Sequence, residues 1–479
     1  MAVYEFELQG RFRDRADERT AMEAWYDRED EQRALMLHGR RRAGKSWLFR
    51  AFAHGKDADI FVASTRGLAD QLHGFAGQLA SDGEQPDLQD LETFLRVLYR
   101  RAKGKRRLAV IDELPNLIAV DSTLPSTLLK VMEEEAAGSR LKLILTGSHV
   151  ALMEELLAER QPLHDRLQRL RVRPLDFWSA RTILGDGPAE RLLTAYGLAG
   201  GMPRYLSELE DAADPLATLA EVALSPLGRL FDEGRAVLAQ ELQQPATYFS
   251  LLAALAFGPA DFETVGRRSR VERHRITKYL ATLRDLGLVA SRVPVTESGI
   301  RTRSRSYVLA DDFLRFWFRY VFPFQPDLEA GLDPTIIVKN EIEPTLADHL
   351  APTIEEVARA WVRRSGLGSA TKVGAWWGRS VDSYRRRGER TSEEIDIVGL
   401  KGNRATVVGE VRWRSRPMSV EILDELDRFK LPALEQAGVK VSHPEIVLVS
   451  RSGFSDGLRR AAEMEPRIHL MGPDDLALI

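Results

Sequence analysis

The sequence predicts an α/β protein with more than one domain. Three short apolar runs alternate with helical segments in the first part of the chain, which is typical of a doubly wound parallel sheet. The runs cover residues 34–37, 108–111 and 143–145. A helix–turn–helix–hairpin pattern follows at residues 245–310, and two further strands with acidic residues are expected within residues 394–413.

Length, charge and cysteine content limit the class of protein. The chain has 479 residues, enough for about three domains. Its 68 Lys and Arg and 71 Asp and Glu give a formal net charge of −3, which excludes a basic coat over the whole surface but not a local basic patch. Cysteine is absent, so disulfides, zinc–thiolate sites and thiol nucleophiles are excluded. No signal core and no run of about 18 apolar residues occur, so we expect a cytoplasmic protein without a membrane span.

A phosphate-binding motif follows the first apolar run. Residues 39–46, Gly-Arg-Arg-Arg-Ala-Gly-Lys-Ser, match G-x-x-x-x-G-K-[ST] in the required strand–loop–helix context. Glycines let backbone N–H groups close around phosphate oxygens, and a helix N-terminus adds partial positive charge. We expect Lys45 to contact the β- and γ-phosphates of ATP and Ser46 to bind Mg²⁺. The other residues expected to surround the nucleotide are Gly39, Arg40, Arg41, Arg42, Ala43, Gly44 and Trp47.

An acidic pair ends the second apolar run. A buried parallel strand at residues 108–111 would place Asp112 and Glu113 at its carboxyl end. Asp112 is expected to bind Mg²⁺, and Glu113 to orient or activate the attacking water. A surface acidic pair would explain this dipeptide if it stood alone, but the upstream phosphate-binding motif favours the catalytic interpretation.

The third apolar run ends in Thr146-Gly147-Ser148. A polar side chain at this place could sense the γ-phosphate, as the sensor 1 position does in AAA+ ATPases. Thr146 and Ser148 are therefore candidate nucleotide contacts. A simple exit from strand to turn explains them equally well.

Three further segments resemble one family. Residues 12–15, Phe-Arg-Asp-Arg, with Glu18 resemble the F-x-x-R-x-x-E opening of prokaryotic AAA+/STAND-related ATPases. Residues 161–166, Gln-Pro-Leu-His-Asp-Arg, are similar to that family's S-P-L-Y-G-R segment, and residues 200–206 resemble its G-G-x-P-x-Y-L motif. These motifs are typical of the archaeal-type ATPase family that carries a C-terminal DUF234 region.

The resemblance implies roles for two residues. Arg166 would act on the γ-phosphate in cis or in trans, and Pro203 would belong to a helical lid over the nucleotide. The sequence departs from the family at His164 and Asp165, beside Arg166. An ordinary surface ion pair for Arg166 and a purely structural turn at Pro203 therefore stay open.

Residues 245–310 predict a winged helix-turn-helix with a cationic outer face. Two amphipathic helices are followed by two strands, and the spacing of apolar residues sets one face of the second helix against the core. Such a surface suits duplex DNA, whereas a nucleotide lid or a protein contact is the alternative. The cations on and before the second helix and on the wing are Arg267, Arg268, Arg270, Arg273, Arg275, Lys278, Arg292, Arg301, Arg303 and Arg305. The aromatic run at residues 307–318 is expected to be core.

Two predicted C-terminal strands carry Asp396 and the tripeptide Glu410-Val411-Arg412. An Asp followed about fourteen residues later by Glu-x-Lys is the PD-(D/E)xK nuclease signature, and DUF234 is similar to this fold. The resemblance implies that Asp396 and Glu410 bind Mg²⁺, while Glu355 supplies an acid from a helix. Glu356 is the neighbouring candidate for that acid.

The expected lysine of this signature is Arg412. Arginine can hold a phosphate but is a poorer activator of water. An active metal nuclease, an inactive nuclease-like domain kept for DNA or protein contact, and an unrelated α/β region therefore all stay open.

The sequence thus predicts five regions: an ATPase core at 1–178, a helical lid at 179–242, a winged helix-turn-helix at 243–322, a linker at 323–345 and a restriction-endonuclease-like DUF234 domain at 346–479. We expect Mg²⁺-dependent ATP binding and hydrolysis that is coupled to DNA binding. The alternative is a nucleotide-gated protein-binding switch with little turnover, whose partner is another protein or a second copy of the chain.

Overall fold

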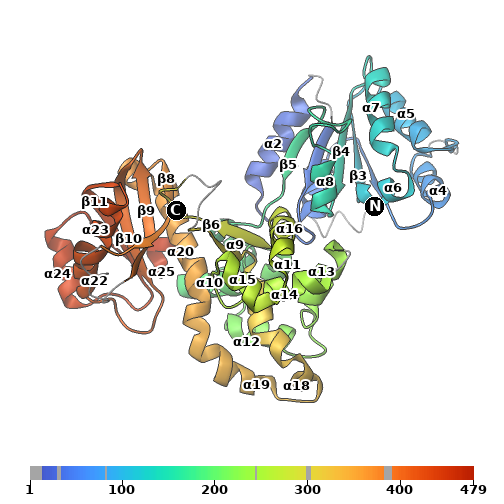
Figure 1. The fold of residues 1–479 in the computed structure, drawn as a ribbon. Helices are drawn as coiled ribbons and strands as arrows, with labels where there is room; N and C mark the ends of the chain where they lie inside the picture. Colours follow the sequence, from blue (N-terminus) through green and yellow to red (C-terminus); the bar gives the residue numbers. More distant parts are fainter. Residues whose placement is uncertain are drawn as a thin grey trace. The chain divides into compact units, whose positions relative to one another are not determined.

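The computed structural model describes residues 13–29, 34–80, 84–242, 245–297, 304–381 and 391–478. The chain divides into two units (Figure 1). The first comprises Met1–Pro174 with Met202–Arg204, and the second comprises Leu175–Gly201 with Tyr205–Ile479. The regions predicted as winged helix-turn-helix and C-terminal domain thus belong to one unit.

A five-stranded parallel sheet forms the centre of the first unit. The strand order is β2-β3-β4-β1-β5, and each neighbouring pair is parallel. The strands are β1 (Ala34–His38), β2 (Ala58–Val62), β3 (Arg107–Asp112), β4 (Leu141–Gly147) and β5 (Gln168–Arg171). Strands β1 and β4 are buried along their whole length, as expected for central strands with both faces covered. The three predicted apolar strands are confirmed as β1, β3 and β4.

Helices connect these strands and complete the core. Phe61 of β2 packs edge-on against Phe75 and Phe94, with ring centroids 5.3 Å and 4.9 Å away. This aromatic cluster ties the helices that carry Phe75 and Phe94 to the sheet. The helices of this unit are α2 (Ala16–Asp27), α3 (Lys45–Ala53), α4 (Leu68–Gln78), α5 (Leu91–Arg101), α6 (Leu114–Val120), α7 (Leu124–Glu135) and α8 (Val150–Glu155).

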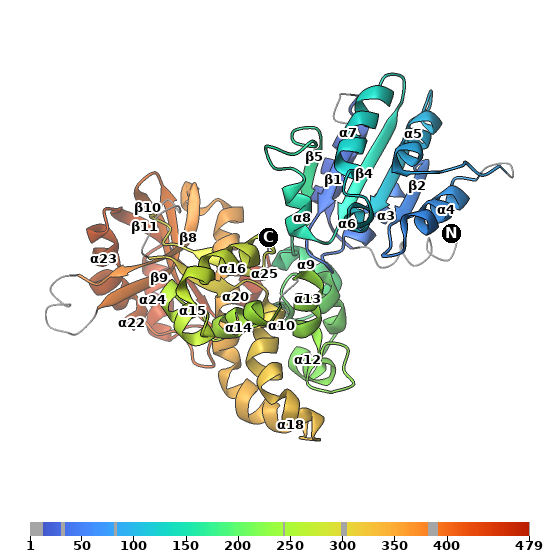
Figure 2. The ribbon, with the colours of Figure 1, turned by 45° about the vertical axis from the view of Figure 1, so that its right-hand side comes forward.

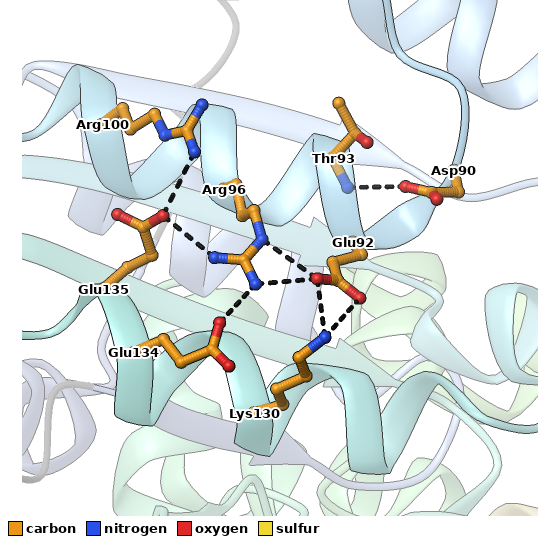
Figure 3. Close-up of polar contacts among 8 residues, drawn as sticks. All are labelled: Asp90, Glu92, Thr93, Arg96, Arg100, Lys130, Glu134 and Glu135. Carbon is orange, nitrogen blue, oxygen red and sulfur yellow. Dashed lines mark hydrogen bonds and ion pairs between the residues drawn. The ribbon is translucent and has the colours of Figure 1, made fainter.

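Helices α5 and α7 lie side by side and share a charged network (Figure 3). Arg96 of α5 pairs with Glu92 one turn earlier at 2.7 Å. It also pairs with Glu135 at 3.1 Å and with Glu134, both at the end of α7. Lys130 of α7 reaches Glu92 at 3.0 Å. These groups are partly exposed, so the network orients the two helices more than it stabilises the fold.

The second unit begins with helices. They are α9 (Phe177–Leu184), α10 (Ala189–Ala199), α11 (Pro203–Leu206), α12 (Pro215–Ala223), α13 (Glu233–Glu241), α14 (Pro245–Leu255), α15 (Phe262–Ser269) and α16 (Arg273–Asp285). The first two residues of α11 belong to the first unit. Strands β6 (Val289–Arg292) and β7 (Ser306–Leu309) then form an antiparallel pair. Arg270, at φ 56°, makes the turn between α15 and α16, and Ile276, Leu280 and Leu283 form the buried face of α16. The order of elements in residues 245–310 is the predicted one.

The segment predicted as a linker, residues 323–345, is helical instead. Helix α17 (Asp312–Phe316) continues through a π-helical turn into α18 (Gln325–Glu329) and α19 (Pro334–Ile337), and a second π-helical turn leads to α20 (Leu346–Ser365). The prolines that suggested a linker stand in the first turn of these short helices, where their missing N–H costs nothing. Helix α20 is also longer than its predicted core at residues 354–361.

A second five-stranded sheet forms the C-terminal part. Its strands are β8 (Lys372–Arg379), β9 (Ser392–Lys401), β10 (Arg404–Arg412), β11 (Lys440–Ser450) and β12 (Ile468–Met471), in the order β12-β11-β10-β9-β8. Strands β8, β9 and β10 are antiparallel, and β10, β11 and β12 are parallel. Its helices are α22 (Glu421–Glu425), α23 (Leu431–Gln436), α24 (Asp456–Met464) and α25 (Pro473–Ala477). Helices α22 to α24 lie on one side of the sheet and α20 on the other (Figures 1 and 2).

Candidate nucleotide site and C-terminal charged cluster

The P-loop, residues 39–46, leaves strand β1 and enters helix α3. Gly44, at φ 90°, directly precedes Lys45, the first residue of the helix. A Cβ atom on Gly39 would lie 2.4 Å from the carbonyl oxygen of Val172, so only glycine fits there. The backbone N–H of Val172 donates to the His38 carbonyl at 2.8 Å, which fixes the start of the loop against the residue after β5.

Lys45 contacts the P-loop itself, and Ser46 lies against the end of strand β3. The buried Lys45 Nζ donates to the carbonyl oxygens of Gly39 and Arg40 at 2.7 Å and 3.0 Å. Ser46 Oγ lies 3.4 Å from Asp112 Oδ2. Hydroxyl and carboxylate oxygens are ligands that Mg²⁺ prefers. Ser46 and Asp112 therefore fit the metal that accompanies ATP, and the Lys45 ammonium fits a phosphate contact.

Asp112 and Glu113 stand at the carboxyl end of β3. Burial, reinforced by the negative charge of Glu113, raises the pKa of Asp112. The Glu113 carboxylate accepts two hydrogen bonds from Ser148, from Oγ to Oε1 at 2.8 Å and from the backbone N–H to Oε2 at 3.3 Å. Glu113 therefore has a fixed direction at the edge where Lys45 and Ser46 lie.

Two other candidates stand apart from this constellation. Thr146 is fully buried, and its hydroxyl has no hydrogen-bond partner among the residues that the structure describes. Arg166 pairs with Glu133 of α7 at 3.2 Å, and its side chain is 54% exposed. In this structure Arg166 is thus engaged in a surface ion pair.

The rest of the predicted nucleotide contacts lie in or beside the P-loop. A Cβ atom on Gly44 would lie 3.6 Å from Pro203 Cγ, which places Pro203 next to the loop within the first unit. The remaining loop residues differ in exposure: buried Arg40 and Ala43, half-buried Arg42, and exposed Arg41 and Trp47.

Arg15 links the N-terminal motif to the P-loop, a function that the motif alone did not specify. Its guanidinium is buried and donates to the Ala43 carbonyl at 2.8 Å, inside the loop. It also donates to the Arg173 carbonyl and to Glu18 Oε1, both at 2.7 Å. Arg15 thus holds the P-loop against the chain that follows β5.

The C-terminal sheet brings Asp396, Glu410 and Arg412 together. Strand register pairs Gly409 with Ile397, so Glu410 of β10 comes opposite Asp396 of β9. Arg412 Nη2 lies 2.9 Å from Glu410 Oε2, an ion pair without hydrogen-bond geometry, and Arg412 Nη1 lies 3.4 Å from Asp396 Oδ2. Burial lowers the pKa of Arg412, but the two carboxylates outweigh it, and the net effect raises that pKa.

Lys430 and Glu355 complete this charged cluster. Lys430 Nζ donates to Glu410 Oε1 at 2.6 Å, and both side chains are buried. No sequence motif indicates Lys430, because it lies on a helical segment twenty residues after its partner. Burial and then the charge of Asp396 raise the pKa of Glu355 to about 7. Arg359 lies 3.6 Å from Glu355 and 2.9 Å from Glu356, and Glu356 is the more exposed of the two acids. Glu355 is therefore the helix-borne acid nearer to the cluster.

Family comparisons agree with both halves of this description. Residues 12–209 match a family described as an ATPase domain predominantly from Archaea. Residues 317–423 match DUF234, described as archaeal and bacterial proteins of unknown function. The chain carries an archaeal ATPase domain and a DUF234 domain. The family resemblance predicted from the sequence motifs is confirmed.

Individual proteins are similar over much of the chain. An uncharacterized protein of Methanocaldococcus jannaschii, MJECL04, is 26% identical over 412 residues, which cover 81% of this chain and 87% of that protein. The Walker-type ATPase PABY2304 of Pyrococcus abyssi is 18% identical, with a TM-score of 0.49 over 64% of this chain and 96% of that chain. The ORC2 protein of Aeropyrum pernix, solved with ADPNP and ADP, is 15% identical, with a TM-score of 0.43 over 67% of this chain and 96% of that chain.

The cations predicted to contact DNA lie between the ATPase and DUF234 matches. Six of them are exposed on α15, on α16 or in the turn between them: Arg267, Arg268, Arg270, Arg273, Arg275 and Lys278. Arg292 of β6 and Arg305, just before β7, are half-buried instead. Arg275 donates to the Tyr279 hydroxyl at 2.6 Å, and Arg273 lies 3.5 Å from Glu263. Arg301 and Arg303 lie outside the described residues.

The hairpin that follows α16 packs on strand β8 of the DUF234 domain. The Val295 N–H donates to the Ala375 carbonyl at 2.8 Å, and the Val295 side chain belongs to the apolar core of the C-terminal sheet. Trp377 Nε1 donates to the Ser304 carbonyl at 3.2 Å. Arg292 was predicted to lie on the outer face, but it is half-buried. Burial lowers the pKa of Arg292, and the negative charge of Glu355 in the C-terminal part counteracts this effect. The segments that extend the two strands toward their connecting loop therefore contact the DUF234 domain.

Across the described parts of the chain, every helix is too short or too polar to traverse a lipid bilayer.

Proposed function

We propose that this protein is a Mg²⁺-dependent ATPase whose nucleotide state controls DNA binding through a winged helix-turn-helix. The observation that carries the proposal is the convergence of Lys45, Ser46, Asp112 and Glu113 at the carboxyl edge of the parallel sheet. Ligands of open α/β sheets bind at this edge. The ATPase family match supports nucleotide as the ligand.

The residues would divide the work as follows. Lys45 would exchange its contacts with the Gly39 and Arg40 carbonyls for phosphate oxygens of ATP, and Ser46 and Asp112 would hold Mg²⁺. A bound Mg²⁺ supplies charge neutralisation at the phosphates. Glu113 would orient the attacking water and accept its proton. Pro203 would border the nucleotide beside the P-loop.

Arg166 is proposed to act from a neighbouring copy of the chain. Its guanidinium is 54% exposed and pairs with Glu133 on the surface, so a second copy could reach it. An arginine supplied in trans stabilises charge on the transferred phosphoryl group.

ATP hydrolysis beside a Glu113→Gln variant tests the proposal. Steady-state turnover should require Mg²⁺, increase with duplex DNA and fall by about 100-fold or more in the variant, because the general base is lost. ATP binding should persist in the variant. Turnover that is unchanged in Glu113→Gln would contradict the assignment. Equal DNA affinity in the nucleotide-free, ADP and ATP-analogue states would contradict the coupling.

The recognition helix is proposed to be α16 and the wing the β6–β7 hairpin. Exposed cations on α15 and α16 support this, and a duplex attracts such a surface through its phosphates. Because Val295 and Ser304 of the hairpin contact the C-terminal sheet, we propose that α16 makes most of the DNA contacts.

A double charge reversal tests whether α16 contacts DNA specifically or only through the net charge of the protein. Arg273→Glu with Arg275→Glu should weaken DNA binding steeply. The slope of log affinity against log salt concentration should fall by about two, because about two phosphate contacts are lost. The control is Arg459→Glu with Arg460→Glu on α24, which changes net charge equally at two exposed residues. Equal loss of affinity in both pairs would contradict a specific role for α16.

A slowly hydrolysing, nucleotide-gated switch that binds a protein is the second candidate function. It is favoured by the Ser148 hydrogen bonds to Glu113, because a carboxylate engaged in this way must rearrange before it accepts a proton from water. Tight ATP binding with negligible turnover and no response to DNA would support the switch.

A further inference from the structure

Three oxygen atoms converge on the guanidinium of Arg412. Nη1 lies 3.4 Å from Asp396 Oδ2 and donates to the main-chain carbonyl of Val411 at 3.1 Å. Nη2 lies 2.9 Å from Glu410 Oε2. Two carboxylates and a carbonyl are the hard oxygen ligands that Mg²⁺ and Mn²⁺ take in proteins. One guanidinium thus occupies the place from which a single cation could contact all three groups.

A second cation closes the other side of Glu410. Lys430 Nζ donates to Oε1 at 2.6 Å, while Arg412 holds Oε2. Glu410 is 0% exposed and Lys430 is 7% exposed, so water cannot take the place of either partner in this ion pair unless the site rearranges. Asp396 Oδ2 is also engaged, because the Val411 N–H donates to it at 2.9 Å. Arg412 and Lys430 therefore pair directly with these two carboxylates, while the third acid of the cluster, Glu355, faces the charge of Asp396.

A divalent cation does not fit this arrangement. It would have to displace the half-buried Arg412 guanidinium and then lie close to the Lys430 ammonium, and both steps cost electrostatic free energy beside the buried Glu410. Mg²⁺ also demands near-octahedral oxygen coordination at about 2.0–2.1 Å. In the described ranges, no group of three or more His, Asp or Glu side chains is placed to hold a metal ion.

We propose that Arg412 is a built-in replacement for a divalent cation, so that the C-terminal sheet binds no Mg²⁺ or Mn²⁺ at Asp396 and Glu410. This proposal is independent of the ATPase activity. It revises the expectation, based on the nuclease signature, that these two carboxylates hold a metal. A domain closed in this way carries out no metal-dependent phosphodiester cleavage and is available for contact with DNA or protein.

Lys430 provides the rival interpretation. Its ammonium approaches Glu410 from a helix and could stand in for the lysine that the strand motif lacks. The carboxylates would then take a metal once Arg412 moved away. The two interpretations differ in one measurable property: the affinity for a divalent cation of the protein in which Arg412 is unchanged.

Mn²⁺ binding, read from the electron paramagnetic resonance signal of free Mn²⁺, tests the proposal on the full-length chain without nucleotide. All proteins carry Asp112→Asn, so that the P-loop site contributes no metal. The parent should bind no Mn²⁺ up to about 1 mM, the range of weak carboxylate sites. Arg412→Ala should gain one Mn²⁺ with an affinity at least about tenfold above that limit, and adding Asp396→Asn should remove it. The exposed Arg414→Ala is the matched control and should behave as the parent.

Two results would overturn the proposal. One is a parent protein that binds one Mn²⁺ and loses it on Asp396→Asn, which would also favour the role of Lys430. The other is a folded Arg412→Ala that gains no Mn²⁺. If Arg412→Ala does not fold, Arg412→Met keeps the aliphatic stem and should show the same gain. The measurement on the parent protein, which retains Arg412, tests the proposal in either case.

Discussion

Ser148 and Glu113 are joined by two hydrogen bonds across the ends of strands β4 and β3. Glu113 has φ 55°, a left-handed conformation that a non-glycine residue keeps only where its surroundings hold it. The Ser148 hydroxyl and N–H contact both carboxylate oxygens and so supply part of that restraint. Glu113, the candidate base for water, and Ser148, the candidate sensor of the γ-phosphate, are therefore directly hydrogen-bonded to each other.

Ser148→Ala should lower kcat without weakening ATP binding. The variant removes the 2.8 Å hydrogen bond that orients Glu113, and a misdirected base lowers turnover by about tenfold or more. The Kd for ATP should stay within about twofold, because the Ser148 hydroxyl is engaged with Glu113 and the P-loop contacts are kept. Steady-state hydrolysis and a fluorescent-ATP titration measure the two quantities. Ser126→Ala, an exposed serine of α7, is the control, and an unchanged kcat in Ser148→Ala would contradict the orienting role.

Arg15→Ala should loosen the P-loop. The substitution leaves the Ala43 and Arg173 carbonyls without the Arg15 donor and separates Glu18 from its partner, so the free energy of unfolding should fall by about 2 kcal/mol or more. ATP affinity should fall by about tenfold at a temperature where the variant stays folded, because binding must then order the loop. Thermal unfolding and nucleotide titration measure both effects.

Two further variants delimit the role of Arg15. Arg15→Lys keeps the charge but not the fork of donors, so it should be intermediate. Arg19→Ala, on the exposed side of α2, should resemble the parent. Unchanged ATP affinity in a folded Arg15→Ala protein would show that the loop does not depend on this contact.

What the sequence predicts is largely local. Strands β1, β3 and β4 were identified because central parallel strands are continuous apolar runs, whereas β5, with alternate residues exposed, has no such run. The P-loop and the acidic pair were identified from contiguous motifs. The contacts of Arg15 with Ala43 and of Lys430 with Glu410 join residues 28 and 20 positions apart, and no spacing rule connects them.

Glu355→Gln should change how stability depends on pH. Burial, followed by the Asp396 charge, raises the pKa of Glu355 in the folded chain from 4.5 to about 7. Between these values the folded chain holds a proton that the unfolded chain releases, so Glu355 makes stability fall as pH rises from about 4.5 to about 7. The variant has no such group and should gain stability relative to the parent at pH 8 but not at pH 5. Melting temperatures of both proteins across this range measure the difference, with Glu463→Gln on α24 as an exposed control, and parallel pH curves would contradict the prediction.

His349→Phe should stabilise the second unit. His349 is 1% exposed, and neither ring nitrogen has a hydrogen-bond partner in the described part of the chain. It packs against Phe316 and Tyr320, with ring centroids 5.9 Å and 5.5 Å away, so an apolar ring suits the site. Removing two unsatisfied polar atoms should increase the free energy of unfolding by about 1 kcal/mol or more.

The gain from His349→Phe should grow as the solution becomes more acidic. Burial, followed by the charges of Arg315 and Arg319, lowers the pKa of His349 well below its usual value of 6.5. Below about pH 6.5 the unfolded chain therefore binds a proton that the folded chain does not, and the parent loses stability as the pH falls. The variant lacks this group, so denaturant unfolding at pH 7.5 and pH 5.5 should show a larger difference between the two proteins at the lower pH. His349→Leu should show the same trend if the larger Phe ring is poorly accommodated, and a difference that shrinks at pH 5.5 in both variants would mean that the folded protein can protonate this histidine.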